Sequence, residues 1–310
     1  MNILKAVLLK LISAFLFALM SAMVRYVGDA VPVGQVVFFR SACAIIPVVV
    51  IYAWRRELAA ALRTSRPLGH FGRGLIATGG MFFSFAALAR LPIVDVTTIS
   101  FVSPLITVAL SAWFLKERVR IYRWSAVVVG LAGVIVMLWP HLDLARYTGD
   151  ASSAAAFGAL FAFAGAFTSA ASVVQTRRLT DTETTSSIVL YFSLFCTVGG
   201  LLTLPLGWAV PTAPQLAALV TIGMIGGFSH ILLTESYRYA PASLVAPLDY
   251  TALFWAFILG YWFFDELPTP TVYFGAAIVA GSGLFVIWRE RQIGLERAKA
   301  RAAAGPPTGA

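Results

Sequence analysis

The sequence predicts an all-α membrane protein with ten transmembrane helices, arranged as two inverted five-helix repeats. Three observations lead to this fold class: the apolar composition, the length of the apolar segments, and a pattern that occurs twice. Of the 310 residues, 59% are hydrophobic and 12% are charged, whereas an average soluble domain has about 25% charged residues. A water-soluble fold cannot cover so much apolar surface, so the composition favours a lipid environment.

The apolar residues fall into ten segments of about 17 to 23 residues, the length at which an α-helix crosses ~30 Å of hydrocarbon. The segments cover residues 6–27, 33–53, 71–89, 94–115, 123–139, 154–176, 186–208, 215–237, 244–264 and 270–288. The first segment resembles a signal peptide near Ser21-Ala22-Met23. Its removal would leave an odd number of spans, so we interpret it as a transmembrane helix.

The basic residues predict the orientation of the spans. With the N terminus in the cytoplasm, the inside segments contain 18 of the 23 Lys and Arg residues, and the outside segments contain two. This asymmetry follows the positive-inside rule and predicts a bacterial inner-membrane protein with both termini in the cytoplasm. It also explains the net charge of +9 without a nucleic-acid partner.

Two stretches about 150 residues apart follow one pattern. Each contains a pair of glycines, a turn with proline and a closing glutamate, and the two glutamates, Glu117 and Glu266, are 149 residues apart. A unit with an odd number of spans must insert its second copy upside down, as in many secondary transporters. We therefore expect a first repeat over residues 1–150, an inverted second repeat over 151–290, and a basic cytoplasmic tail without regular structure over 291–310.

Several short motifs accompany the doubled unit. They are Phe39-Arg40, Leu115-Lys116-Glu117-Arg118, the stretch from Trp124 to Gly133 and the stretch from Tyr273 to Gly283. With them the chain resembles the ten-span EamA type of the drug/metabolite transporter superfamily. This resemblance implies a basket of helices around a central cavity, with the third, fourth, eighth and ninth spans near its axis. The Phe38-Phe39-Arg40-Ser41 run is also similar to the branch that includes S-adenosylmethionine carriers.

Polar residues in the eighth predicted span are the first candidates for a binding site. An ionised side chain near the bilayer centre costs ~2.5 to 3.5 kcal/mol, so such a residue is expected to face a cavity or a partner. His230, Thr234 and Glu235 lie within six residues. They either line a cavity that binds a cationic group or a coupling proton, or serve packing, with Glu235 paired to Arg238.

The ninth and fourth predicted spans supply further candidates. Asp249 and Tyr250 follow a proline and form either a binding element at a helix break or a purely structural kink. Ser100, Ser103 and Thr107 are spaced to form one stripe along a continuous helix. That stripe either lines a pathway or bonds main-chain carbonyls one turn back, a frequent role of hydroxyls in membrane helices.

Two arginines lie near the predicted outer ends of the first two spans. Arg40 either reads the anionic end of a substrate or pairs with Asp29 or Asp95, and Arg25 presents the same two alternatives. Three phenylalanines, Phe82, Phe83 and Phe167, offer rings on which an apolar or aromatic substrate can stack. With 23 phenylalanines in the chain, most are expected to face lipid or the protein core.

These residues lead us to expect a secondary carrier that works by alternating access and exports rather than imports a small metabolite. An amino acid or related zwitterion fits a site with both carboxylates and arginines. The alternatives are an S-adenosylmethionine-type uptake carrier and a structural membrane subunit that transports nothing. The sequence has no ATP-binding motif, no metal-ligand cluster and no catalytic set, so we expect neither an enzyme nor a cofactor. The expected partners are the substrate, protons as a candidate coupling ion, and the lipid bilayer.

Overall fold

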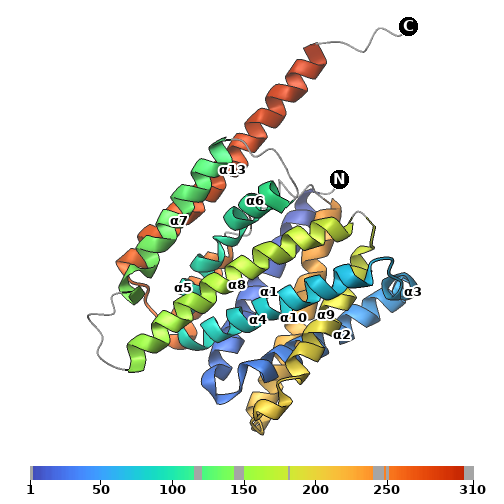
Figure 1. Ribbon diagram of the computed structural model, residues 1–310, viewed down its shortest axis with the longest axis vertical. Coiled ribbons are helices and arrows are strands. Elements are labelled where there is room, and N and C mark those ends of the chain that lie inside the picture. Colours follow the sequence, from blue (N-terminus) through green and yellow to red (C-terminus); the bar gives the residue numbers. More distant parts are fainter. Residues whose placement is uncertain are drawn as a thin grey trace.

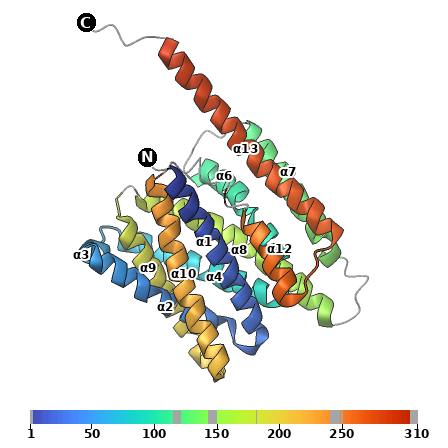
Figure 2. The ribbon, with the colours of Figure 1, turned by 180° about the vertical axis from the view of Figure 1, so that it is seen from behind.

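The structure is a computed structural model that describes residues 3–114, 121–142, 150–180, 182–239, 248 and 251–303. Within these residues every regular element is a helix (Figures 1 and 2). The α-helices are α1 (Ile3–Val27), α2 (Val33–Trp54), α3 (Leu58–Leu62), α4 (Pro67–Arg90), α5 (Ile93–Ser100), α6 (Ser103–Phe114), α7 (Ile121–Leu142), α8 (Asp150–Thr180), α9 (Thr185–Leu201), α10 (Ala213–Tyr239), α12 (Thr251–Phe264) and α13 (Pro270–Ala303). Short 3-10 helices, η1 (Gly28–Ala30) and η2 (Leu204–Leu206), follow α1 and α9.

Six helices are long and apolar enough to cross a membrane. Their spans run over Leu4–Val27, Val33–Trp54, Pro67–Arg90, Ala154–Thr176, Ser186–Leu206 and Ala213–Leu233. Four further apolar helical segments are shorter, over Ile93–Thr107, Trp124–Gly133, Thr251–Phe264 and Pro270–Phe285. Large apolar side chains such as Trp54 (87% exposed) cover the outside, an arrangement that suits lipid rather than water. The chain is thus an all-helical, multi-pass membrane protein, and the count of ten spans and the inverted repeat stay predictions.

Helices that are distant in the sequence pack in pairs. α1 lies along α10, α4 along α8, and α7 along α13, while α2 contacts both α9 and α10. Figure 1 shows α4 and α8 on the near face of the bundle, and Figure 2 shows α1 and α10 on the opposite face. The α7–α13 pair lies at the side of the bundle, next to α5 and α6. The α1–α10 and α4–α8 pairs therefore form two layers.

The two ends of the bundle are named after a glutamate at each end. The Glu266 end contains the last residues of α1 and α4: Arg25 of α1 contacts Glu266, and so does the main-chain N–H of Ile93, which follows α4. The Glu183 end is where α4 begins, because Glu183 contacts Ser65 just before it. The basic loops predict that the Glu183 end faces the cytoplasm.

Glycines allow α2 and α10 to approach closely. A Cβ atom at Gly227 would lie 2.6 Å from Cγ of Pro47, and one at Gly223 would lie 2.6 Å from the main-chain oxygen of Phe39. The four-residue spacing places both glycines on the face toward α2. This close approach brings Arg40 of α2 into the middle of the bundle, where a Cβ at Gly226 would lie 3.3 Å from its Nε.

The fourth predicted span is two helices rather than one. α5 ends at Ser100 and α6 begins at Ser103. Pro104 explains the break, because proline has no N–H to bond the carbonyl of Ser100, and in a continuous helix a proline ring clashes with the carbonyl four residues earlier. The predicted stripe through Ser100, Ser103 and Thr107 is therefore interrupted.

The C-terminal segment also differs from the prediction. The expectation was a tail without regular structure after the tenth span, but α13 continues as a helix to Ala303. Residues 289–303 consist largely of Ala, Arg, Glu and Lys, which have high helix propensities. The apolar span ends before residue 289, but the helix continues, because charged residues alone do not end a helix.

Candidate functional site

A cavity of about 600 Å³ lies between the two helix layers. Its volume falls within the range of small-molecule sites, about 300 to 1,000 Å³. Its walls come from α1, α2, α4, α5, α8, α9 and α10. The polar residues that line it are Arg40, Arg73, Ser84, Ser100, Ser169, Ser172, Thr176 and His230. Aromatic residues, Phe17, Phe85 and Phe192, form part of its apolar wall.

Arg40 lies in this cavity with unsatisfied hydrogen-bond donors. The residue is 3% exposed, and its Nε and Nη1 atoms are buried without a hydrogen-bond partner among the described residues. Its guanidinium carbon lies 5.5 Å from the centre of the Phe192 ring, a cation–π distance. The expected ion pair with Asp95 is not formed within the described part of the chain, and the side chain of Asp29 is not described. A buried charge with open donors is costly.

Arg73 of α4 is the second guanidinium in the cavity wall. Its Nε donates to Oγ1 of Thr176 on α8 at 2.7 Å, and its Nη1 donates to the carbonyl of Ile188 on α9 at 3.0 Å. Its guanidinium carbon lies 5.2 Å from the centre of the same Phe192 ring. One phenyl ring is therefore shared by two arginines, and Arg73 connects three helices around the cavity.

His230 of α10 occupies an aromatic corner of the cavity. Its ring lies 5.2 Å from that of Phe17, perpendicular to it, and 5.7 Å from that of Phe192. The imidazole thus packs against rings from α1 and α9. This corner suits a flat or apolar part of a ligand.

Among the described residues, the charges in the cavity wall are positive. Arg40 and Arg73 line it, and no Asp or Glu of the described residues does so. Hydroxyls of α4, α5 and α8 supply neutral donors and acceptors. The arrangement can therefore bind an anionic group together with an uncharged, partly aromatic remainder.

Three of the sequence-predicted site residues, Arg40, Ser100 and His230, line this cavity. Ser103 follows the helix break on α6, and Phe82 packs against the apolar core. Phe83 stacks on Phe161 with ring centres 6.1 Å apart, and Phe167 is 47% exposed. None of these four is among the residues that line the cavity. Asp249, Tyr250 and the side chain of Thr234 lie outside the described residues.

Arg25 and Glu235 form ion pairs away from this cavity. Arg25 contacts Glu266 at 3.1 Å and donates to the carbonyls of Leu88 and Ala89. Glu235 contacts Arg55, directly after α2, at 2.6 Å. The side chain of Arg238, its expected partner, lies outside the described residues. Both residues therefore connect helices at opposite ends of the bundle.

Sequence reasoning did not propose Arg73, Phe192 or the hydroxyls of α8 as site residues. The sequence contained a signal for Arg73 and for the hydroxyls of α8. Arg73 falls inside an apolar segment, and Ser169, Ser172 and Thr176 have the i, i+3, i+7 spacing of one helix face. Phe192 has no such signal, because it is one phenylalanine among 23.

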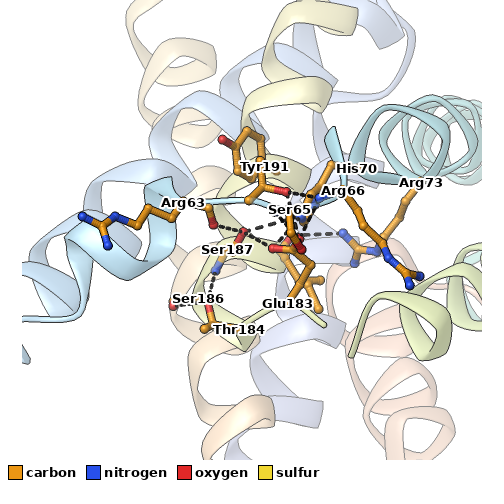
Figure 3. A network of polar contacts seen from close by, with 12 residues as sticks. Arg63, Ser65, Arg66, His70, Arg73, Glu183, Thr184, Ser186, Ser187 and Tyr191 are labelled. Atoms are coloured by element: carbon orange, nitrogen blue, oxygen red, sulfur yellow. Dashed lines mark hydrogen bonds and ion pairs between the residues drawn. The ribbon is translucent and has the colours of Figure 1, made fainter. Parts of the chain in front are cut away.

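A second buried charged cluster lies at the Glu183 end (Figure 3). Oε1 of Glu183 accepts hydrogen bonds from the N–H groups of Ser65 and Arg66, at 2.8 and 3.0 Å, and from the hydroxyls of Thr64 and Ser65. Oε2 lies 3.4 Å from Nε2 of His70. Burial raises the pKa of the Glu183 carboxyl, but hydrogen bonds from Ser65, Thr64 and His70 lower it by more. The resulting pKa is about 2, below the usual value of 4.5. This carboxylate joins the α8–α9 connection to the start of α4.

A positively charged cavity of small-molecule size, enclosed by apolar helices that can span a membrane, defines the protein as a membrane transporter. The chain belongs to the EamA-like transporter family, whose model matches residues 4–139 and again residues 156–288. Its homologues are named as transporters of the drug/metabolite transporter superfamily.

The relatives differ in cargo and direction. The chain is 30% identical to an S-adenosylmethionine uptake transporter of Rickettsia prowazekii over 288 residues, which cover 91% of this chain and 92% of that protein. It is 29% identical to a pseudopaline exporter of Pseudomonas aeruginosa over 286 residues, covering 91% and 93%. A crystal structure with 19% identity and a TM-score of 0.62, covering 93% of this chain and 98% of that one, has the same fold.

Proposed function

We propose that the chain is a secondary carrier that moves a small metabolite across the bacterial inner membrane by alternating access. The observation that carries this proposal is the cavity with its charged lining, whose walls come from both predicted repeats. The first repeat supplies α1, α2, α4 and α5, and the second supplies α8, α9 and α10. A site between two such units can open to either side when one unit rocks against the other.

Helix packing supports two equivalent halves. In chain order the first half contains α1, α2, α4, α5–α6 and α7, and the second contains α8, α9, α10, α12 and α13. Helices at the same position in the two halves are counterparts, so α1 corresponds to α8 and α4 to α10. Exchanging each helix for its counterpart turns the α1–α10 pair into the α8–α4 pair, and both pairs are present. The α2–α9 and α7–α13 pairs each join a helix to its own counterpart. This exchange symmetry is what a pseudo-two-fold axis between repeats requires.

The contacts further support a state that is closed at the Glu266 end. Leu91, Ile93 and Leu219 are fully buried there, next to the ion pair of Arg25 with Glu266. α1 and α4 contact each other, whereas their counterparts α8 and α10 share few or no contacts within the described residues. We propose that the cavity faces the Glu183 end in this state.

For the cargo we propose an amino acid or related zwitterion, moved outward. The alternative is uptake of S-adenosylmethionine, which is supported by the similarity to the Rickettsia prowazekii protein. Both compounds contain an α-amino acid group, so the same cavity suits either. A structural subunit without transport is the remaining alternative.

Counterflow in proteoliposomes tests the proposal. Vesicles loaded with unlabelled compound are given labelled L-methionine or labelled S-adenosylmethionine, and empty liposomes serve as the control. Exchange of the amino acid is the expected result. Exchange of S-adenosylmethionine alone would support the alternative cargo, and no exchange of any compound by folded protein would contradict the carrier.

A further inference from the structure

We propose that Arg40 and Arg73 form a carboxylate subsite, so that the cargo must carry a carboxylate group. The proposal rests on the proposed function and specifies the charge that the cavity recognises. Both arginines lie inside the apolar bundle, and both line the cavity and contact the ring of Phe192.

The first argument is the missing counter-charge. Arg25 and Arg55 each have a carboxylate partner, at 3.1 and 2.6 Å. Arg40 and Arg73 have none within the described part of the chain. A buried cation is expensive unless it is paired. A ligand that supplies the negative charge would remove this cost.

The second argument is the phenyl ring that both cations contact. Each guanidinium carbon lies between 5 and 6 Å from the centre of one ring, at 5.5 Å for Arg40 and 5.2 Å for Arg73. Both positive charges therefore belong to the wall of one low-dielectric cavity. An anion in that cavity is attracted by both of them.

The third argument is the geometry of the donors. Arg73 is fixed by hydrogen bonds to Thr176 and Ile188, whereas two donors of Arg40 are open. A preorganised guanidinium and one with free donors in the same cavity can each receive a carboxylate oxygen, since such charge-assisted bonds are short and strong. The hydroxyls of Ser169 and Ser172 remain available to accept a hydrogen bond from an ammonium group of the same cargo.

Matched pairs of ligands test the subsite directly. Binding to the purified protein is measured by calorimetry for L-methionine and L-methioninamide, and for S-adenosylmethionine and its decarboxylated form. We expect the wild-type protein to bind each carboxylate at least ~10-fold more tightly than its partner, the ratio that one good charge-assisted contact provides. In Arg40→Gln and Arg73→Gln this ratio is expected to fall close to one.

Arg90→Gln is the matched control, because Arg90 is an exposed arginine on the same helix as Arg73 and its ratio is expected to equal that of the wild type. Thermal unfolding of each variant verifies that it is folded. Equal affinity of the wild type for acid and amide, or no binding of any compound at millimolar concentration, would overturn the subsite. Stronger competition by inorganic phosphate than by acetate would overturn its assignment to carboxylate.

One further variant excludes an internal partner. Asp249 lies outside the described residues, so the double variant Arg40→Gln, Asp249→Asn is measured with the single variants. Restoration of wild-type affinity in the double variant would mean that Arg40 neutralises Asp249, and would overturn the proposal. Carboxylate-selective binding without counterflow would refute the carrier and leave the subsite intact. Equal counterflow of acids and amides would refute the subsite and leave the carrier intact.

Discussion

The Glu183 cluster and the Arg40–Arg73 pair are both buried and charged, but they differ in how their charges are satisfied. One oxygen of Glu183 accepts four hydrogen bonds, two of them from main-chain N–H groups. Arg40 has two buried donors without a partner among the described residues. A saturated charge has no capacity left for a ligand, whereas an open one does. The comparison distinguishes a charge that stabilises the fold from a charge that is proposed to bind the cargo.

The largest effect is expected from Glu183→Ala. Removal of the carboxylate takes the acceptor from the N–H of Ser65 and one of two partners from the N–H of Arg66 and from Nε2 of His70. We therefore expect a loss of about 3 to 5 kcal/mol in the free energy of unfolding. Thermal unfolding in detergent measures it. Glu57→Ala is the control, because the Glu57 side chain makes no hydrogen bond among the described residues. Equal losses in the two variants would show that saturation at Glu183 contributes nothing.

A pH series tests the contribution of Glu183 to stability more closely. The folded pKa of Glu183 is lowered from 4.5 to about 2, so its contribution to stability is complete above pH 4.5 and is lost as the pH falls toward 2. The stability difference between wild type and Glu183→Gln should therefore be constant near neutrality and shrink below pH 4.5. A difference that grows on acidification would contradict the assignment.

The ion pair at the Glu266 end lies between the two extremes. Arg25 and Glu266 are partly exposed, with 24% and 13% of their side-chain surface accessible. We expect a coupling of about 1 to 2 kcal/mol, above that of an exposed pair and below that of a buried one. A double-mutant cycle with Arg25→Gln and Glu266→Gln measures this coupling by thermal unfolding. A coupling near zero would mean that the pair does not help to close this end.

The smallest effect on stability is expected from Arg40→Gln. Its charge has no carboxylate partner among the described residues, and its removal relieves a desolvation cost. The free energy of unfolding should therefore change by less than about 1 kcal/mol or rise. The measurement is the same thermal unfolding series. A loss as large as that of Glu183→Ala would break the comparison, because it would give Arg40 a structural role.

The sequence was sufficient to predict the helices that lipid requires. In a bilayer each backbone polar group must be bonded within its own helix, so apolar length alone locates the spans, and six segments match helices of sufficient length. Pro104 could have predicted the break between α5 and α6. The helical continuation of α13 was not predicted, because the charged residues after the apolar span were interpreted as the end of the helix.

The site was predictable only in part. Arg40 and His230 stood out as polar residues in apolar segments, and the structure places both at the cavity. The partners of Arg25 and Glu235 could not be predicted, since they are 241 and 180 residues away in the chain. Such pairs depend on how the two halves pack. Hydropathy does not contain that information.

Protection of a cavity cysteine against a maleimide reagent tests the central claim most directly. Ser172 lines the cavity on α8, and Ser172→Cys is introduced after Cys43 and Cys196 are replaced by alanine. We expect a carboxylate ligand to slow the labelling, its amide to have no effect, and Arg40→Gln to abolish the protection. Labelling at the same rate with and without the carboxylate, in protein that binds it, would place the binding site elsewhere.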